Sequence, residues 1–354
     1  MDGRAACVPG GYRETLEGPR IRSTVPEGPA RLLIALKPDD RTSGAVLRIL
    51  PSVPWTYARS SDPSAWGKVE ALLVGSVDRE LGPFNHASTP SLRFVQSIYT
   101  GLDQFPFTRF PDSIPVAANG GAYAPFVAEH AVALALASAR EIVAGQAQMR
   151  THTLRPPPAI RLLVGRTAVI LGYGAIGREI ARRLAGFDIR IIGVNRTGRM
   201  APGCSAMLPA DRLKEALTEG DFVFDVRPLT RTTRGTIGAE ELAAMRPQAI
   251  YVNVGRAATV DEEALYRHLV AHPDFRAALD PWWQEDFAKG TFASRLPFVD
   301  LPNFVGTPHS AGFGPATEQF SLERALENLA RFFRGVPPRY VVDRREYSRP
   351  DLPG

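Results

Sequence analysis

Apolar runs of strand length alternate along the chain with segments whose apolar residues fall at helical spacing. Runs at residues 31–36, 71–74 and 92–96 predict the strands of a small unit, with less regular, partly helical segments between them. From residue 167 the alternation becomes regular. The predicted strands there are 167–171, 189–194, 222–224, 249–253, 277–279 and 304–306, and the predicted helices are 176–185, 211–218, 239–245 and 261–271. This order predicts an α/β fold in which helices cover both faces of a parallel sheet.

Breaks in the pattern indicate how the chain is divided. Residues 1–30 lack periodicity and are expected to form a flexible N-terminal extension. A helix is predicted to open at Ala124–Pro125, because proline is favoured in the first turn, and a proline-rich loop follows at 151–158. The last helix carries one apolar face, with Leu322, Leu326, Leu329 and Phe333, and is placed to cross back to the small unit. The predicted division is a substrate-binding domain from residues 31–125 plus 318–354 and a dinucleotide-binding domain from residues 126–317.

The composition is that of an ordinary globular protein, with 44% apolar and 22% charged residues in 354. A net charge of +5 is dispersed along the chain, which favours small anionic ligands and argues against a nucleic-acid partner. No stretch approaches the roughly 20 apolar residues of a membrane span, so no membrane association is expected. The two cysteines, Cys7 and Cys204, show neither a disulfide framework nor metal-ligand spacing. We therefore expect no metal and a cytoplasmic protein.

A glycine-rich turn between a predicted strand and a predicted helix is the most informative local motif. Residues 172–177 read Gly-Tyr-Gly-Ala-Ile-Gly. The first glycine suits a tight turn, the second lets backbone approach a pyrophosphate, and the third lets the helix pack close to the strand. Such a turn can be purely structural, but its context favours a dinucleotide site in which the helix N-terminus faces the phosphates. The predicted cofactor contacts are Gly172, Tyr173, Gly174, Ala175, Ile176 and Gly177.

The end of the next predicted strand bears on the choice of dinucleotide. An acid at this point would accept hydrogen bonds from the ribose 2′-hydroxyl of NAD, but the chain has Asn195, followed by Arg196 and Thr197. No carboxylate is there to repel a 2′-phosphate, and an arginine fork suits one. NADP is therefore predicted as the preferred cofactor. The alternative is that the arginine only decorates a solvated loop and that NAD binds.

Side chains suited to acid–base and carboxylate chemistry follow three later strands. Arg256 comes after strand 249–253, the segment from Asp280 to Glu285 follows strand 277–279, and His309 follows strand 304–306. Ligands of an open parallel sheet bind at the carboxyl ends of its strands, so these groups are expected to face one crevice. They suit hydride transfer to a 2-oxo acid, which needs a fork for the carboxylate, a proton donor for the developing alkoxide and an acid to hold the imidazolium.

With these residues the chain resembles the D-isomer-specific 2-hydroxyacid dehydrogenases. The resemblance rests on the glycine motif and on the segments Gln96–Asp103, Asn119–His130, Arg227–Thr230, Tyr251–Arg256, Val260–Leu265, Ala278–Asp280 and Thr307–Gly312. It implies two Rossmann-like domains with parallel sheets, one a flavodoxin-like substrate domain and the other a doubly wound dinucleotide-binding domain. It also implies a cleft between them that closes on the substrate, and commonly a homodimer.

The same resemblance implies roles for individual residues. Arg256 would bind the substrate carboxylate and polarise the oxo group, while Glu285 would support His309 in transferring the proton. Asp280 would hold the nicotinamide carboxamide. The remaining implied contacts are Tyr99, Thr100 and Gly101 for the substrate, the last two through backbone N–H groups, and Pro228 for the cofactor.

Three departures from the family pattern stand out. Asp225 and Arg227 place charges in a segment that is usually apolar or carries a histidine, and the sequence offers no account of them. Gly255 and Ala257 exchange the usual small residues around the arginine. The residues between Asp280 and Glu285 are unusual and include two tryptophans, which are expected to pack as wall and core.

The predicted function is an NADP-preferring reductase of 2-oxo acids of the glyoxylate or hydroxypyruvate type. Oxidation of formate or phosphite is a weaker alternative within the same chemistry. An alternative from another class is a nucleotide-sensing interaction protein on the same scaffold. The presence of Arg256, Glu285 and His309 together favours the enzyme, because a sensor has no need of all three.

Overall fold

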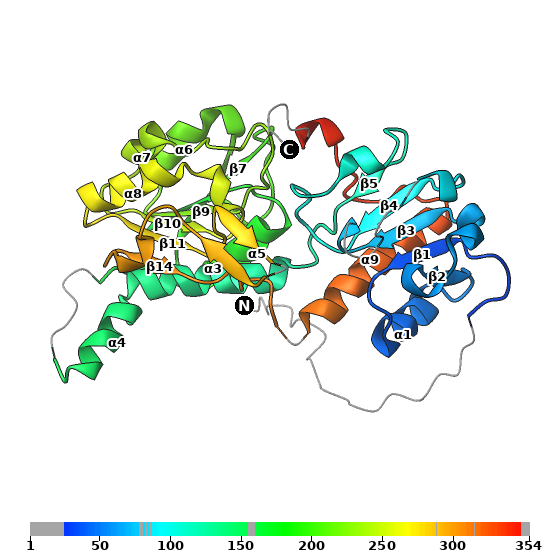
Figure 1. Cartoon of the computed structure of the whole chain (residues 1–354). Coiled ribbons are helices and arrows are strands. Elements are labelled where there is room, and N and C mark those ends of the chain that lie inside the picture. Colours follow the sequence, from blue (N-terminus) through cyan, green and yellow to red (C-terminus); the bar gives the residue numbers. More distant parts are fainter. Residues whose placement is uncertain are drawn as a thin grey trace, which may run out of the picture.

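The structure is a computed structural model that describes residues 25–77, 81, 84, 86–154, 160–287, 289–314 and 316–347. Two parallel sheets, each with its own helices, lie side by side (Figure 1). The predicted α/β class is confirmed. Most of the predicted N-terminal extension, residues 1–24, and part of the predicted proline-rich loop, residues 155–159, lie outside the described residues.

The smaller sheet has the strand order β2-β1-β3-β4-β5, and all of its pairs are parallel. This is the flavodoxin-like order that was predicted. Its strands are β1 (Leu32–Ala35), β2 (Trp55–Tyr57), β3 (Ala71–Val74), β4 (Phe94–Ser97) and β5 (Val116–Ala117). On one face, helices α1 (Asp40–Ile49) and α9 (Thr317–Phe333) pack against each other and form a core with the sheet. The last helix therefore returns to the smaller sheet, as its apolar face indicated.

The larger sheet has the order β14-β11-β10-β9-β6-β7-β8, again with parallel pairs throughout. Its strands are β6 (Thr167–Leu171), β7 (Arg190–Asn195), β8 (Ala206–Pro209), β9 (Phe222–Asp225), β10 (Ile250–Asn253), β11 (Arg276–Leu279) and β14 (Phe304–Gly306). Five helices flank it, namely α3 (Ala124–Ala139), α5 (Ala175–Leu184), α6 (Leu213–Glu219), α7 (Ala239–Ala244) and α8 (Glu262–Ala271). In Figure 1, α3 lies below this sheet and α6 to α8 above it.

Alternate residues of one strand show why both faces are covered. In β6, Ala168 and Ile170 join the core formed with α3 and α5, while Val169 and Leu171 join the core formed with α6 to α8. A strand buried on both faces reads as a continuous apolar run, which is the pattern seen in the sequence. The sheet is thus doubly wound, and its strand order reverses between β6 and β9, where such sheets bind ligands.

Several short elements carry no clear signal in the sequence. Strands β2 and β5, the edge strand β8 and the antiparallel hairpin of β12 (Gln284–Asp286) with β13 (Thr291–Ala293) contain two to four residues each. Helix α4 (Ile142–Arg150) projects away from the larger sheet in Figure 1 and has no buried residue. The short strands form by pairing with other strands, and α4 has no buried face. The spacing of apolar residues in the sequence therefore does not reveal these elements.

Candidate active site

The glycine turn has the geometry that its sequence predicts. Gly172 has φ +89°, a left-handed conformation that favours glycine, and the N–H groups of Gly172 and Tyr173 both donate to the carbonyl of Val194 at 2.9 Å. A Cβ at Gly177 would lie 2.9 Å from the carbonyl oxygen of Gly172, so α5 packs directly on the turn. A Cβ at Gly174 would meet only that same oxygen, at 3.9 Å, and no side chain caps α5. The start of α5 is therefore open to a pyrophosphate, and the dinucleotide fits here.

The side chains of this turn point in different directions. The ring of Tyr173 is buried beneath β7, and its hydroxyl donates to the carbonyl of Pro202 at 3.0 Å. Ile176 packs against the core on the α3 side. Ala175 and Ile176 are partly exposed at the start of α5. Only the main chain of Tyr173 can face a bound dinucleotide.

Residues 195–199 form a tight turn at the carboxyl end of β7. Asn195 uses its amide within this turn, donating to the carbonyl of Arg199 at 2.8 Å and accepting from the N–H of Thr197 at 3.1 Å. Arg196 extends from the turn with its side chain 80% exposed and forms an ion pair with Glu346 at 2.9 Å. The guanidinium that was predicted to bind a 2′-phosphate is therefore already paired with a carboxylate.

Arg256 lies where the two units meet. It follows β10, and its Nε donates to the carboxylate of Asp103 at 3.0 Å, while one terminal nitrogen donates to the carbonyl of Gly255 at 2.9 Å. Gly101, in the loop after β4, lies so close that a Cβ there would overlap the guanidinium. The structure thus brings together the arginine of one unit and the predicted substrate loop of the other.

His309 and Glu285 form a close pair. Nδ1 of His309 lies 2.6 Å from Oε1 of Glu285, and the same oxygen accepts from the backbone N–H of Trp282 at 2.8 Å. Since the carboxylate only accepts, Nδ1 is the donor, and Nε2 is left for another partner. His309 has φ +51°, which is unusual for a residue with a side chain. The exposed ring of Phe287 stands edge-on to the imidazole, with centroids 5.1 Å apart.

Asp280 is buried and organises the loop that carries His309. Its carboxylate accepts from the hydroxyl of Thr307 at 2.6 Å and from the N–H groups of Ser310 at 2.8 Å and Ala311 at 3.0 Å. His130, on α3, approaches it to 3.4 Å and contacts the hydroxyl of Thr307 at 3.0 Å. Burial alone would raise the pKa of Asp280, but these hydrogen bonds outweigh it and lower the pKa below its usual value.

The unexplained charges of the sequence form a buried pair between the glycine turn and the arginine loop. Arg227 donates to the fully buried Asp225 at 2.9 Å, and Asp225 also accepts from the hydroxyls of Tyr251 at 3.1 Å and Thr259 at 3.0 Å. A Cβ at Gly255 would lie 2.7 Å from the carbonyl of Arg227. Glycine is therefore required before Arg256, because a Cβ there would overlap the main chain of Arg227.

The other predicted contacts are placed as follows. Tyr99 is 45% exposed after β4, and the hydroxyl of Thr100 donates to the carbonyl of Asn119 at 2.9 Å. Pro228 is exposed in the loop after β9. The two tryptophans pack in or against the core on the α6 to α8 side, as expected for wall and core residues.

Sequence reasoning assigned no site role to four residues that contact the site. Asp103 and His130 lie within segments that carried the family resemblance, so their positions could have been noted from those motifs. Glu346 and Tyr347 belong to the C-terminal segment, which contains no motif. Only the tertiary structure reveals that they approach residues of the larger unit.

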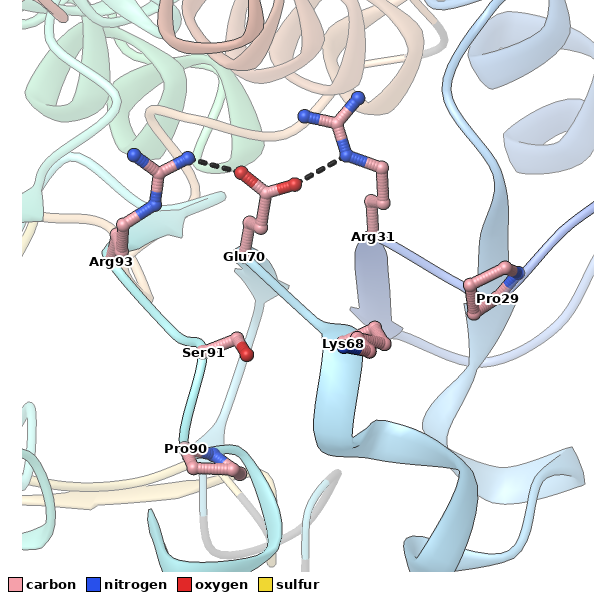
Figure 2. Close-up of a pocket in the computed structure, with 7 residues that line it drawn as sticks. All are labelled: Pro29, Arg31, Lys68, Glu70, Pro90, Ser91 and Arg93. Carbon is pink, nitrogen blue, oxygen red and sulfur yellow. Dashed lines mark hydrogen bonds and ion pairs between the residues drawn. The ribbon is translucent and has the colours of Figure 1, made fainter.

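A pocket of about 500 Å³ lies at the amino ends of strands of the smaller sheet (Figure 2). Arg31, Glu70 and Arg93 precede β1, β3 and β4, whereas the substrate loop follows β4, so the two places lie at opposite ends of the strands. The carboxylate of Glu70 binds both arginines, whose guanidinium groups lie over aromatic rings of α9 at 5.3 and 5.4 Å. The pocket wall therefore joins strand ends to α9 and is separate from the candidate active site. Its lining residues are Pro29, Arg31, Lys68, Glu70, Pro90, Ser91 and Arg93.

Within residues 25–347, apart from the gaps given above, no three His, Cys, Asp or Glu side chains gather as metal ligands would. The helices in the same part of the chain include none with the length and apolar character needed to cross a bilayer.

Comparisons with known proteins agree with this geometry. The NAD binding domain of D-isomer specific 2-hydroxyacid dehydrogenases matches residues 132–311. A glyoxylate reductase of Pyrococcus furiosus is 33% identical over 287 residues, covering 76% of this chain and 80% of the relative. A hydroxypyruvate reductase of Thermotoga maritima is 30% identical over 269 residues, covering 75% and 85%. A solved structure of a provisional formate dehydrogenase from Pyrobaculum aerophilum has a TM-score of 0.76 at 30% identity, covering 90% of this chain and all of that one.

Proposed function

Because the chain belongs to the D-isomer-specific 2-hydroxyacid dehydrogenases, we propose that it reduces small 2-oxo acids such as glyoxylate and hydroxypyruvate, with NADPH as the preferred reductant. The observation that carries this proposal is the His309–Glu285 pair at 2.6 Å on the same unit as an arginine that reaches the substrate loop of the other unit. An imidazole with a bound carboxylate is equipped to deliver a proton, and the arginine is equipped to hold a carboxylate.

In the proposed reaction, a bound reduced nicotinamide supplies a hydride to the carbonyl carbon of the 2-oxo acid. Arg256 binds the substrate carboxylate and polarises the oxo group. Nε2 of the imidazolium of His309 donates its proton to the carbonyl oxygen, so the product is the 2-hydroxy acid and the histidine becomes neutral. Glu285 holds Nδ1–H and stabilises the positive charge of the imidazolium before the transfer.

The backbone of the smaller unit completes the proposed substrate site. The N–H groups around Thr100 and Gly101, beside the guanidinium of Arg256, bind the carboxylate together with it. Asp103 keeps the guanidinium in place through its hydrogen bond at 3.0 Å. Asp280 orients the loop of His309 and is assigned the nicotinamide carboxamide as its ligand.

The assignment of NADP rests on the turn at residues 195–199. Asn195 provides no carboxylate, and the exposed guanidinium of Arg196 lies one residue beyond the ribose position. A charge-assisted fork of this kind suits a 2′-phosphate.

The domain assignment follows the two sheets. We assign residues 31–125 and 318–354 to the substrate-binding domain and residues 126–317 to the dinucleotide-binding domain.

We also propose that the enzyme is a cytoplasmic homodimer. Its subunits are proposed to meet through α4, because this helix exposes the apolar side chains of Ile142, Val143 and Met149.

The alternative of a nucleotide-sensing interaction protein is not favoured, since the curated relatives are named as reductases. The function is tested by following NADPH and NADH oxidation with a panel of 2-oxo acids. Turnover of glyoxylate or hydroxypyruvate, faster with NADPH, is expected. Oxidation of formate in place of any 2-oxo acid reduction would contradict the proposal.

A further inference from the structure

The partner of Arg196 comes from the C-terminal segment, 150 residues further along the chain. After α9 the chain runs antiparallel to β5, with Val341 bridging Ala117, and then forms the short helix Arg344–Glu346. In Figure 1 this last segment, in red, lies between the two units. It places the carboxylate of Glu346 2.9 Å from the guanidinium of Arg196.

Both units hold the segment that carries this carboxylate. On the side of the smaller unit, Arg344 donates to the carbonyl of Phe110 at 2.9 Å, and the ring of Tyr347 packs 5.6 Å from that of Phe107. On the side of the larger unit, the N–H of Arg231 donates to the carbonyl of Glu346 at 2.9 Å. The Glu346 side chain is only 31% exposed, in contrast to most acids in surface ion pairs of this chain. Its main chain is thus held on both sides of the ion pair.

The charges around the pair are otherwise accounted for. Arg345 binds Asp343 at 2.7 Å and so is not the partner of Glu346. Burial raises the pKa of the Tyr347 hydroxyl, the charges of Glu346 and Asp103 raise it further, and Arg256 and Arg196 oppose the rise. The segment therefore lies within electrostatic reach of both the ribose end and the substrate end of the site.

A carboxylate here acts in opposite ways on the two dinucleotides. It competes with a 2′-phosphate for the guanidinium of Arg196 and repels the phosphate charge. By contrast, it can accept a hydrogen bond from a 2′-hydroxyl, as the acid at the end of the second strand does in proteins that bind NAD. Its ion pair with Arg196, the residue that follows Asn195, places this carboxylate where it can replace the acid that the turn lacks.

We propose that Glu346 is a specificity-determining residue that weakens NADP binding and supports NAD binding, so that the enzyme accepts both dinucleotides with a smaller NADP preference than Arg196 alone would produce. This inference rests on the proposed function, and specifically on the placement of the adenosine ribose beside Arg196. It concerns a residue outside the dinucleotide-binding fold, supplied by the C-terminal segment of the substrate unit.

The test is calorimetric titration of the full chain, without substrate, with NADPH and with NADH. Glu346→Gln keeps the size of the side chain and removes its charge. The dissociation constant for NADPH is expected to fall by roughly three- to tenfold, as for the loss of one like charge near a partly exposed site, while that for NADH stays constant or rises.

Glu219→Gln is the matched control. Glu219 pairs with Arg190 at 3.2 Å in another exposed arginine–glutamate pair, at the opposite end of β7 from Arg196. This variant changes the net charge equally and should leave the ratio of the two dissociation constants as in the native chain.

An unchanged ratio of the two dissociation constants in Glu346→Gln would overturn the inference while leaving the proposed function intact. If both nucleotides also bound more weakly by the same factor, the residue would have a structural role. If the native chain bound neither nucleotide, the proposed function would fail and the inference with it.

Discussion

Oε1 of Glu285 accepts from two donors, the backbone N–H of Trp282 and Nδ1 of His309, and this double contact orients the imidazole. The unusual residues between Asp280 and Glu285 leave this contact in place, because the chain turns back so that Trp282 caps the carboxylate. The φ of +51° at His309 is held by hydrogen bonds from its N–H to the carbonyls of Asp280 and Thr307. Strained backbone conformations are found most often at functional sites, so the conformation of His309 supports its proposed catalytic role.

The role proposed for Arg256 requires its planar fork. In Arg256→Lys the charge remains but the paired contacts to Asp103 and substrate are lost, so kcat/KM for the 2-oxo acid should fall roughly 10- to 100-fold. The dissociation constant for NADPH should change little. Arg267→Lys, an exposed change on α8, serves as the control in the same steady-state assay. Native turnover by Arg256→Lys would show that this residue does not bind the carboxylate.

At the scale of elements, the sequence predicts the regular alternation from β6 to β14 well, because strands buried on both faces read as continuous apolar runs. The glycine turn and the ends of β10, β11 and β14 could be assigned to one site for a different reason, because parallel strands bring their carboxyl ends to the same edge of the sheet. The contact between Arg256 and Asp103 could not be derived, as it depends on how the two units meet. Likewise, Glu346 has no local signal, because its contact with Arg196 joins residues 150 positions apart.

The loop after β14 depends on Asp280, and its stability should depend on pH. The pKa of Asp280 is lowered in the folded chain, so its ionised form stabilises the fold above its usual pKa of 3.8, and this contribution is lost as the pH falls through the lowered value. The amide of Asp280→Asn has one accepting oxygen and cannot accept from the hydroxyl of Thr307 and the N–H groups of Ser310 and Ala311 together. The free energy of unfolding should therefore fall by about 1–3 kcal/mol at neutral pH.

Urea unfolding between about pH 5 and pH 2 measures this effect. The free energy of unfolding of the native chain should fall more steeply with decreasing pH than that of Asp280→Asn, so that the difference between them narrows. Asp211→Asn, at an exposed position before α6, should follow the native curve. A constant difference between native chain and Asp280→Asn across this range would show that the buried carboxylate does not carry the pH dependence.

At the scale of the whole molecule, the substrate and cofactor residues come from two units joined at Arg256, at Arg196 and through α9. The structure places Arg256 beside Asp103 and Gly101, and Arg196 beside Glu346, where the two units meet. Helix α4 is the exception to this compact arrangement, because it extends from the larger unit with its apolar side chains exposed.

If α4 forms the subunit contact, charge on its apolar side chains should separate the subunits. Ile142→Glu combined with Val143→Glu should shift the mass measured by light scattering from dimer to monomer, since burying unpaired carboxylates is costly. Gln146→Glu, on the same helix, adds charge without replacing an apolar residue and should keep more of the dimer. A native chain that is monomeric at high concentration would contradict the proposed assembly.

Transfer of deuterium from NADPH carrying deuterium at both C4 positions to hydroxypyruvate tests the central claim most directly, with the glycerate analysed by mass spectrometry and chiral chromatography. The native enzyme should yield D-glycerate with one deuterium at C2. His309→Gln should bind NADPH normally but transfer deuterium about 10²–10⁴-fold more slowly, because glutamine can donate a hydrogen bond but cannot deliver the proton. Glycerate without deuterium, or a native rate in His309→Gln, would contradict the account.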